Sequence, residues 1–434
     1  MSTLATSKDI ANEIVDSFDT ADFTSAIENR KKAIEILKVK GLPGSKQEEY
    51  RFTPITKSLE KKFIWKSKPV TASLKSIDDF LIPTLDAYVL VFINGSYSKE
   101  LSNQEFPTGI KVSTLKDALE SNYPATTKYF DKLVNSESDS FAALNTAFWQ
   151  DGIFIHVPEN TTVEKSFLIL HVTDTNQEPI ISHTRILGVI EKNSSIHIVE
   201  KFDTTGKNPV FHTLSEEFVV GEQANFEYCK IQNDSKQNQV ANTVIHQSNS
   251  SKVNTFTLTL QGELIRNNLN IIIDGENCES HFHGLYLLNG NTLADNHTVV
   301  DHRKPNSFSN EIYKGIMDEN SKGVFNGKIF VRPHAQKTNA FQSNRNVIIS
   351  DSASINTKPQ LEIWADDVKC SHGCTSGQLD EEAMFYLRSR GIAEPMAKAM
   401  LLYAFAVDVL ETLEHEGLRT HLDNLIAERL HKNF

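Results

Sequence analysis

The chain has 434 residues, of which 56 are acidic and 44 are basic, and its formal net charge is −12, so nucleic acid and anionic membranes are not expected as its main partners. The mean hydropathy is −0.34 and no apolar run approaches about 18 residues, which excludes a membrane-spanning helix. The N-terminus lacks the pattern of a secretory signal and only four cysteines are present, so a cytoplasmic location without disulfides is expected.

The N-terminal region is expected to be helical. One helix is predicted over residues 8–18 and a second over residues 25–40, because their apolar positions recur at helical spacing. Gly41 is suited to end the second helix. In the charged loop that follows, the expected arrangement is a surface ion pair between Glu48 and Arg51.

The sequence pattern changes over residues 86–367, where short runs rich in Val, Ile, Phe and Thr recur at a spacing of roughly 10–13 residues, as in a series of β-strands. Polar turns separate them, and one helix is expected over residues 115–134. A region this long exceeds a single sandwich of about 100 residues. Stacked coils of a β-solenoid fit the pattern, with helices capping both ends. A propeller is the structural alternative, although no repeated Trp-Asp pair marks its blades.

The C-terminal tail is predicted to form helices over residues 380–390, 393–413 and 418–430, with Asp380 as the first N-cap. The three expected domains are an N-terminal helical domain, a β-solenoid core, and a junction strand followed by a C-terminal helical domain. Their expected boundaries are 1–85, 86–367 and 368–434.

A cluster of potential metal ligands lies at the junction, in the stretch 361–392. Strand alternation places Cys370 and His372 on one face, and thiolate and imidazole are ligands for iron, zinc or iron–sulfur clusters. Cys374 shares that face if the strand continues through Gly373. Three ligands within five residues cannot surround a metal ion, so distant residues or another chain must complete the site. From spacing alone the favoured interpretation is a buried cysteine beside a hydrogen-bonded histidine, and the metal site is the alternative.

Other catalytic motifs are absent from the sequence. It contains no G-x-x-x-x-G-K-[ST], G-x-G-x-x-G, G-x-S-x-G, H-E-x-x-H or C-x-x-C, so ATP hydrolysis through a P-loop is not expected. His281 and His283 alternate on a predicted strand and are expected to be ordinary polar residues of a β-surface, with a metal site there as the alternative.

The junction LEIWADDVKCSHGCTSGQLDEEAMFYLRSRGI resembles the C-terminal signature of the SufB/SufD family of iron–sulfur cluster assembly proteins. GLPGSKQEEYRFT, FAALNTAFWQDGIFIHVPENTTVE and GVFNGKIFVRPHAQKTNAFQSNRNVIIS are similar to further elements of that family, so the resemblance covers nearly the whole chain. D-D-V-K-x-S-H-G favours the SufD branch, as does the lack of a cysteine near Ala353, where the SufB branch carries one.

This resemblance implies a right-handed parallel β-helix flanked by N-terminal and C-terminal helical domains. It implies a scaffold subunit, not an enzyme and binding no nucleotide, that pairs with SufB through the end of the β-helix and binds the ATPase SufC through its C-terminal helices. His372, and after it Cys370, would hold iron or a transient iron–sulfur cluster at the SufB interface. A homodimer is possible in isolation, and the role of Cys374 stays open.

Two other classes of function remain as alternatives at this point. One is a β-helix enzyme that acts on polysaccharides, which the missing secretion signal and the lack of an evident carboxylate pair disfavour. The other is a purely structural β-helix adaptor.

Overall fold

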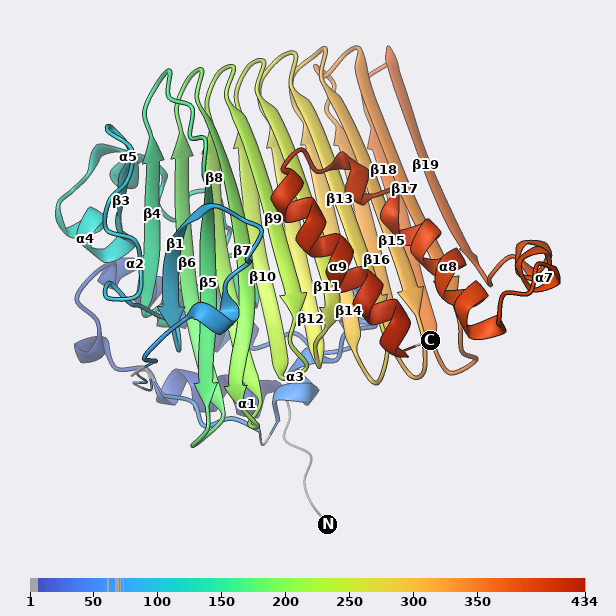
Figure 1. The fold of residues 1–434 in the computed structure, drawn as a ribbon. Helices are drawn as coiled ribbons and strands as arrows, with labels where there is room; N and C mark the ends of the chain where they lie inside the picture. Colours follow the sequence, from blue (N-terminus) through green and yellow to red (C-terminus); the bar gives the residue numbers. More distant parts are fainter. Residues whose placement is uncertain (1–6, 61, 67–69, 71, 73, 434) are drawn as a thin grey trace.

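A parallel two-sheet solenoid dominates the computed structural model, which describes residues 7–60, 62–66, 70, 72 and 74–433 (Figure 1). Within these residues, ten strands form one sheet, sheet A, and nine form the other, sheet B. The chain alternates between the sheets, so each coil adds one strand to each. The predicted mainly β solenoid is confirmed, and the propeller alternative is wrong because its blades would be antiparallel.

Sheet A contains the strands β1 (Ala87–Ile93), β2 (Ser96–Tyr97), β5 (Ser166–Thr175), β7 (Ser195–Gly206), β9 (Asn225–Asn233), β11 (Lys252–Gln261), β13 (Glu279–Leu288), β15 (Phe308–Met317), β17 (Thr338–Ile348) and β19 (Val368–Gly377). Sheet B contains the strands β3 (Lys111–Thr114), β4 (Asp151–Val157), β6 (Ile180–Ile190), β8 (Val210–Val220), β10 (Gln237–Gln247), β12 (Leu264–Ile273), β14 (Leu293–His302), β16 (Lys322–Val331) and β18 (Ser354–Ile363).

Residues in the left-handed conformation stack at the corners that lead from sheet B to sheet A. Asn193, Gln223 and Ser250 have φ angles of 55°, 57° and 56°. The backbone N–H of Asn193 donates to the Glu222 carbonyl and that of Gln223 to the Asn249 carbonyl, each at 2.9 Å, so one corner is tied to the next. β-branched residues avoid this conformation, which explains the polar turns between the predicted strands.

The N-terminal end of the solenoid is closed by antiparallel strands and short helices. β2 pairs antiparallel with β1, and β3 pairs antiparallel with β4. The single helix predicted over 115–134 is wrong, because two helices, α4 (Leu115–Glu120) and α5 (Pro124–Tyr129), occupy this stretch. Asn122 has a φ of 51° between them, and Pro124 cannot continue a preceding helix.

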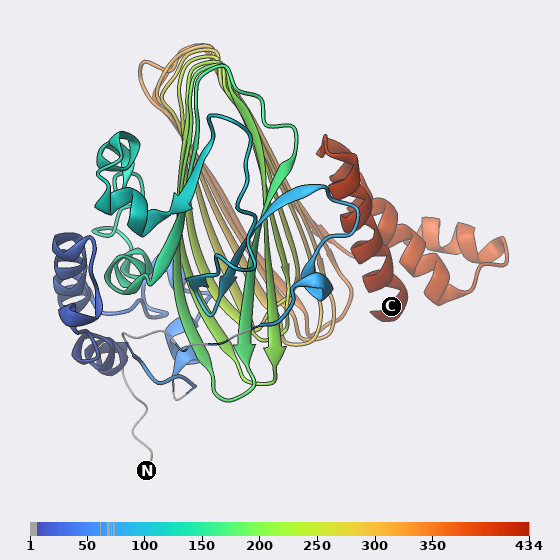
Figure 2. The same ribbon diagram turned by 60° about the vertical axis from the view of Figure 1, so that its left-hand side comes forward.

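Helices of the N-terminal region cover the outer face of sheet B (Figure 2). They are α1 (Ser7–Asp16), α2 (Ile27–Lys40), α3 (Ile55–Leu59) and, further along the chain, α6 (Ser140–Phe148). Phe141 of α6 packs with Phe211 and Leu264 of the sheet in one buried cluster. Gly41 ends α2 as predicted, with a φ of 67° and its N–H donating to the Leu37 carbonyl at 2.8 Å.

The loop after α2 lies against the last coils of sheet B. Glu48 forms an ion pair with Lys358 of β18, and the Glu49 carboxylate lies 2.6 Å from the Lys328 ammonium of β16. The predicted ion pair between Glu48 and Arg51 is therefore wrong, because the fold brings lysines of distant coils to these carboxylates.

The C-terminal helices are α7 (Glu381–Ser389), α8 (Glu394–Val407) and α9 (Glu416–Asn433). Two of the three, α8 and α9, cover the outer face of sheet A, whereas α7 has no buried residue and projects from the solenoid (Figure 2). The helix predicted over 393–413 ends at Val407, and a 3-10 turn over Leu410–Thr412 reverses the chain towards α9. Lys314 of β15 anchors this unit, with its ammonium 2.5 Å from the Asp408 carboxylate. Among the described helices, none is long and apolar enough to cross a membrane.

The C-terminal end of the solenoid is open. β18 and β19 are the last strands of their sheets, and each pairs with a single neighbour among the described strands. The prediction that the terminal helices cap both ends is wrong here, because the apolar faces of α8 and α9 pack on the outer surface of sheet A instead.

A charged cluster is buried inside the solenoid, between the two sheets. The Lys230 ammonium lies 2.9 Å from the Glu216 carboxylate and 3.4 Å from the Glu200 carboxylate. Tyr228 donates its hydroxyl to Glu200 at 2.6 Å, and a His171 ring nitrogen lies 2.8 Å from the same carboxylate. Burial, with repulsion from Glu200, raises the pKa of Glu216 to about 7.

Close packing inside the later coils depends on glycines, which gives a first prediction. A Cβ at Gly284 would lie 2.2 Å from a ring carbon of the buried Tyr313. Gly284→Ala is therefore expected to lower the free energy of unfolding by about 1–3 kcal/mol through overpacking, measured by chemical denaturation. Gly44→Ala is the control, because nothing lies within 4 Å of its added carbon. Equal stability of the two variants would contradict the prediction.

Candidate metal site at the open end of the solenoid

The junction cysteines and histidine lie on a single uninterrupted strand. β19 pairs with β17 in unbroken parallel register from Val368 opposite Thr338 to Gly377 opposite Val347. Gly373 does not break the strand, because it is held in this ladder opposite Ser343. Side chains two residues apart on a strand share a face, so Cys370, His372 and Cys374 form one row. We call this row the β19 ligand row.

The β19 ligand row faces the interior of the solenoid. Cys370 packs against the main interior hydrophobic cluster. The Thr357 hydroxyl of β18 donates to the Cys374 sulfur at 3.2 Å, a contact that crosses from sheet B to sheet A. Because no further coil follows, the interior ends at this row, and the His372 side chain between the two cysteines is exposed.

The β19 ligand row is not a complete metal site by itself. Positions two apart on a strand are separated by about 6.6 Å, which is too far for all three side chains to bind one ion from one strand. Among the described residues, no three His, Cys, Asp or Glu side chains are grouped so that they could hold a metal ion. The unpaired edges of β18 and β19 leave room for a second chain to approach the row.

The thiol of Cys370 is partly withdrawn from water. Burial raises its pKa, and the hydrogen bond with the Ala340 backbone opposes this shift. The free thiol therefore favours its protonated form, and a bound cation is needed to stabilise the thiolate.

A polar layer that the sequence reasoning missed lies directly behind the row. Gln342 of β17 stands opposite His372, and Asn344 stands opposite Cys374. The Gln342 amide donates to Glu311 of β15 at 2.7 Å. Gln342 and Asn344 lie on the buried face of β17, whose residues alternate with more exposed ones such as Phe341 and Arg345, and this alternation could have indicated them.

The remaining cysteines and the predicted histidine pair lie elsewhere. Cys229 and Cys278 are buried and free, away from the open end. His281 and His283 stack with ring centroids 6.1 Å apart, and a ring nitrogen of His281 lies 2.7 Å from the Glu279 carboxylate. This is the polar β-surface arrangement that was expected.

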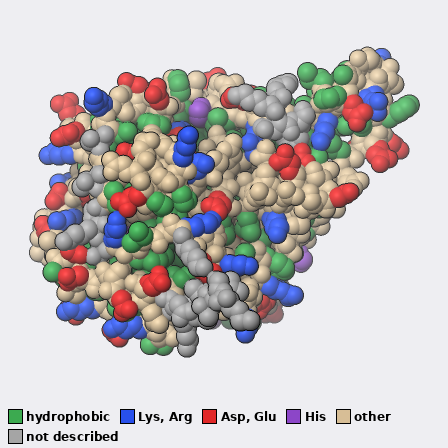
Figure 3. Space-filling model, turned by 90° about the horizontal axis from the view of Figure 1, so that it is seen from below, with side chains coloured by type: hydrophobic (Ala, Val, Ile, Leu, Met, Phe, Trp, Pro, Cys, Tyr) green, Lys and Arg blue, Asp and Glu red, His purple; other side chains and the backbone are tan. Residues whose placement is uncertain are grey.

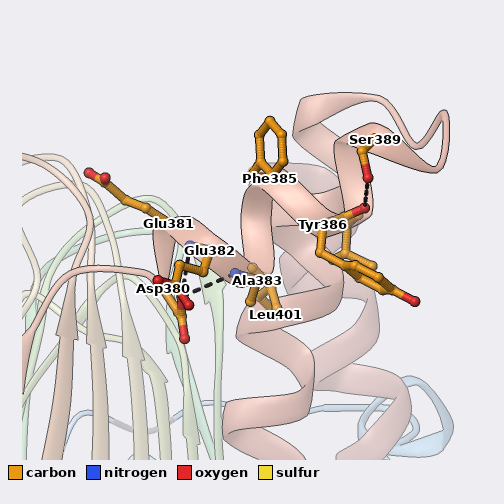
Figure 4. Close-up of a pocket in the computed structure, with 9 residues that line it drawn as sticks. Asp380, Glu381, Glu382, Ala383, Phe385, Tyr386, Ser389 and Leu401 are labelled. Atoms are coloured by element: carbon orange, nitrogen blue, oxygen red, sulfur yellow. Dashed lines mark hydrogen bonds between the residues drawn. The ribbon is translucent and has the colours of Figure 1, made fainter.

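A second exposed feature is the surface that residues 380–389, at and in α7, form with Leu401 of α8. We call it the α7–α8 surface. Phe385 is 74% exposed and Tyr386 is 57% exposed, and both project outward from α7 (Figure 4). Asp380 accepts hydrogen bonds from the backbone N–H groups of Glu382 and Ala383 at 2.9 and 3.1 Å, as predicted for the N-cap. From below, hydrophobic, acidic and basic side chains lie together on this projecting unit (Figure 3).

Comparison with known proteins places these features in a family context. The family model described as "SUF system FeS cluster assembly, SufBD core domain" matches residues 171–405, and that of the "SufBD protein N-terminal region" matches residues 10–169. An iron–sulfur cluster assembly SufBD family protein of Synechocystis is 32% identical over 93% of this chain and 91% of its own.

Two similar proteins carry the name SufD. The iron–sulfur cluster assembly protein SufD of Escherichia coli is 30% identical, over 90% of each chain. SufD of Bacillus subtilis is 26% identical over 77% of this chain and 76% of its own. The matches span the solenoid and the helices on both sides of it.

Proposed function

The chain belongs to the SufBD family of iron–sulfur cluster assembly proteins, and from this premise we propose that it is a scaffold subunit whose open solenoid end pairs with SufB. In this role it holds iron or a nascent iron–sulfur cluster as cargo, and it carries no ATPase site of its own. The family matches favour this function over a polysaccharide-acting enzyme or a structural adaptor.

The observation that carries the proposal is the β19 ligand row at an end with unpaired strand edges. A second β-solenoid can continue both sheets by pairing with β18 and β19, which uses the free backbone donors and acceptors. His372, with Cys370 beside it, would then lie between two chains, where the partner supplies the ligands that the row lacks.

The test is His372→Ala in a complex reconstituted anaerobically with SufB and SufC. Iron and sulfide bound per complex are expected to fall by at least about 10-fold, because a cargo ligand is lost. His281→Ala is the matched control, since that histidine lies on the outer face of sheet A. Unchanged iron and sulfide in an intact His372→Ala complex would overturn the proposal.

The α7–α8 surface supports a second part of the proposed function, the docking of SufC. Phe385 and Tyr386 are large, exposed and adjacent to the carboxylates of Glu381 and Glu382. Aromatic anchors beside charges are typical of the centres and rims of protein interfaces. We assign this surface to the ATPase subunit because α7 projects from the solenoid beside its open end, so a partner can reach both aromatic side chains without pairing with the strands (Figure 1).

Replacing both aromatic residues by alanine is expected to weaken SufC binding by about 30-fold or more, measured by titration calorimetry, because exposed aromatic anchors contribute most to such interfaces. Val39→Ala on α2 is the control, as Val39 is 83% exposed on the opposite side of the molecule. Equal affinity of the double variant and the control would show that SufC binds elsewhere.

A further inference from the structure

A row of inward-facing side chains leads from the buried interior to His372. Strand pairing places Glu311 of β15 opposite Gln342 of β17, and Gln342 opposite His372 of β19. Adjacent strands lie about 4.8 Å apart, so each side chain lies directly behind the next. Glu311 and Gln342 are almost completely buried, whereas His372 is exposed at the end.

The hydrogen bonds of Gln342 fix which way its amide points. Its NH₂ group donates to Oε2 of Glu311 at 2.7 Å. Burial raises the pKa of Glu311 to about 7, so its ionised form is present near neutral pH. This form can only accept hydrogen bonds, so the amide nitrogen faces Glu311 and the amide oxygen faces away from it.

The oxygen of Gln342 has no partner among the described residues, although the side chain is only 3% exposed. Buried polar atoms are normally paired, so an orphaned acceptor needs an explanation. The neighbour in the row on its free side is His372, whose imidazole can donate one N–H.

Gly327 of the facing β16 leaves room for the amide of Gln342. A Cβ at Gly327 would lie 2.2 Å from the amide nitrogen of Gln342 and 2.7 Å from its amide carbon. The Gln342 side chain therefore occupies the space that Gly327 leaves open, and any larger residue at position 327 would displace its amide.

We propose that Gln342, oriented by Glu311, is the positioning residue for His372: its amide oxygen accepts one imidazole N–H and directs the other ring nitrogen, unprotonated, towards the open end. This inference rests on the proposed function, in which His372 binds iron or a cluster. Histidines that bind metals depend on such a hydrogen bond to the second nitrogen, which sets the tautomer and orients the ring.

The first test measures binding of ferrous iron alone to the anaerobic complex with SufB and SufC. Gln342→Met keeps the length of the side chain and removes the acceptor, so the affinity is expected to fall by about 10–100-fold. Gln239→Met is the matched control, because Gln239 is also buried and faces the interior, but on β10, far from the end. Equal affinity of both variants would overturn the proposal.

The second test exchanges the two polar groups. Glu311→Gln with Gln342→Glu keeps one amide–carboxylate hydrogen bond and keeps an acceptor behind His372. The double exchange is expected to restore most of the affinity that Gln342→Met loses, whereas a purely structural role of the pair predicts no recovery. Failure of the exchange variant, folded and in an intact complex, to bind iron better than Gln342→Met would contradict the inference.

A spectroscopic measurement separates this inference from the proposed function. In the metal-free complex with SufB and SufC, with ¹⁵N-labelled histidine in this chain, the open end is covered, and the ring N–H of His372 is expected to contact Gln342 and be protected from solvent exchange. His372→Ala identifies its signal. Gln342→Met is expected to remove this protection, and Gln239→Met to preserve it. If the signal is protected and depends on Gln342 while His372→Ala leaves cluster content unchanged, the proposed function fails and the positioning contact stands. An unprotected wild-type signal overturns the positioning contact alone.

Discussion

Lys230→Met is expected to lower the free energy of unfolding by about 3–5 kcal/mol, the largest loss among the substitutions considered for the solenoid. The ammonium of Lys230 lies between the carboxylates of Glu216 and Glu200, and all three side chains are almost completely buried. Removing the cation leaves two acidic groups close together in a medium that solvates charge poorly. Chemical denaturation of the full chain measures the loss.

Two further variants show whether the loss comes from the buried carboxylates. Lys192→Met removes a cation from an exposed ion pair with Glu222 and is expected to cost no more than about 1 kcal/mol. Adding Glu216→Gln to Lys230→Met removes one uncompensated carboxyl group and is expected to recover part of the stability. If the Lys230→Met and Lys192→Met proteins are equally stable, water reaches the carboxylates of Glu216 and Glu200, and the prediction is wrong.

A second large effect is expected on acidification, through His183. Burial beneath α6, where the Phe148 ring centroid lies 5.8 Å away, lowers the pKa of His183 to about 3. The unfolded chain protonates this residue near pH 6.5. The neutral histidine therefore contributes stability above pH 6.5, and this contribution is lost as the pH falls from 6.5 towards 3. The loss amounts to about 1.4 kcal/mol per pH unit, or about 2.7 kcal/mol by pH 4.5.

Comparison of the wild-type chain with His183→Asn isolates this contribution. The variant loses packing at every pH, but it lacks the titration, so its free energy of unfolding should fall less steeply below pH 6.5. Phe148→Leu is the control, because it disturbs the same contact and keeps the histidine, so its curve should run below that of wild type with nearly the same slope. Parallel curves for wild type and His183→Asn would contradict the prediction.

The solenoid could be predicted because its signal is local and repeated. Apolar runs such as those of β5 and β12 and the polar corners at Asn193 and Ser250 recur at every coil. The position of the terminal helices could not be predicted, because an apolar helix face is compatible with the end of a solenoid or with its side. The structure places α8 and α9 against the side, where outward Val and Leu residues of sheet A match them.

The candidate site was predictable only in its local part. Alternation along one strand identified Cys370 and His372, but whether Gly373 interrupts the strand depends on the ladder with β17. Gln342 and Glu311 are separated by 31 residues and meet only through the stacking of coils. The unequal lengths of the intervening turns hide this register from any periodicity in the sequence.

The connection between β19 and α7 has a mechanical consequence. Only residues 378–380 separate Gly377, the last residue of β19, from the start of α7. A force that pulls α7 outward acts through this short connection on the end of β19. It would break the backbone hydrogen bonds between β19 and β17 in sequence, beginning at Gly377. Cys374 would separate from β17 first, His372 next and Cys370 last. The helix α9 would stay in place, because its buried apolar residues pack against the outer face of sheet A. The order of the three side chains along the strand is thus also the order in which a cargo would lose them.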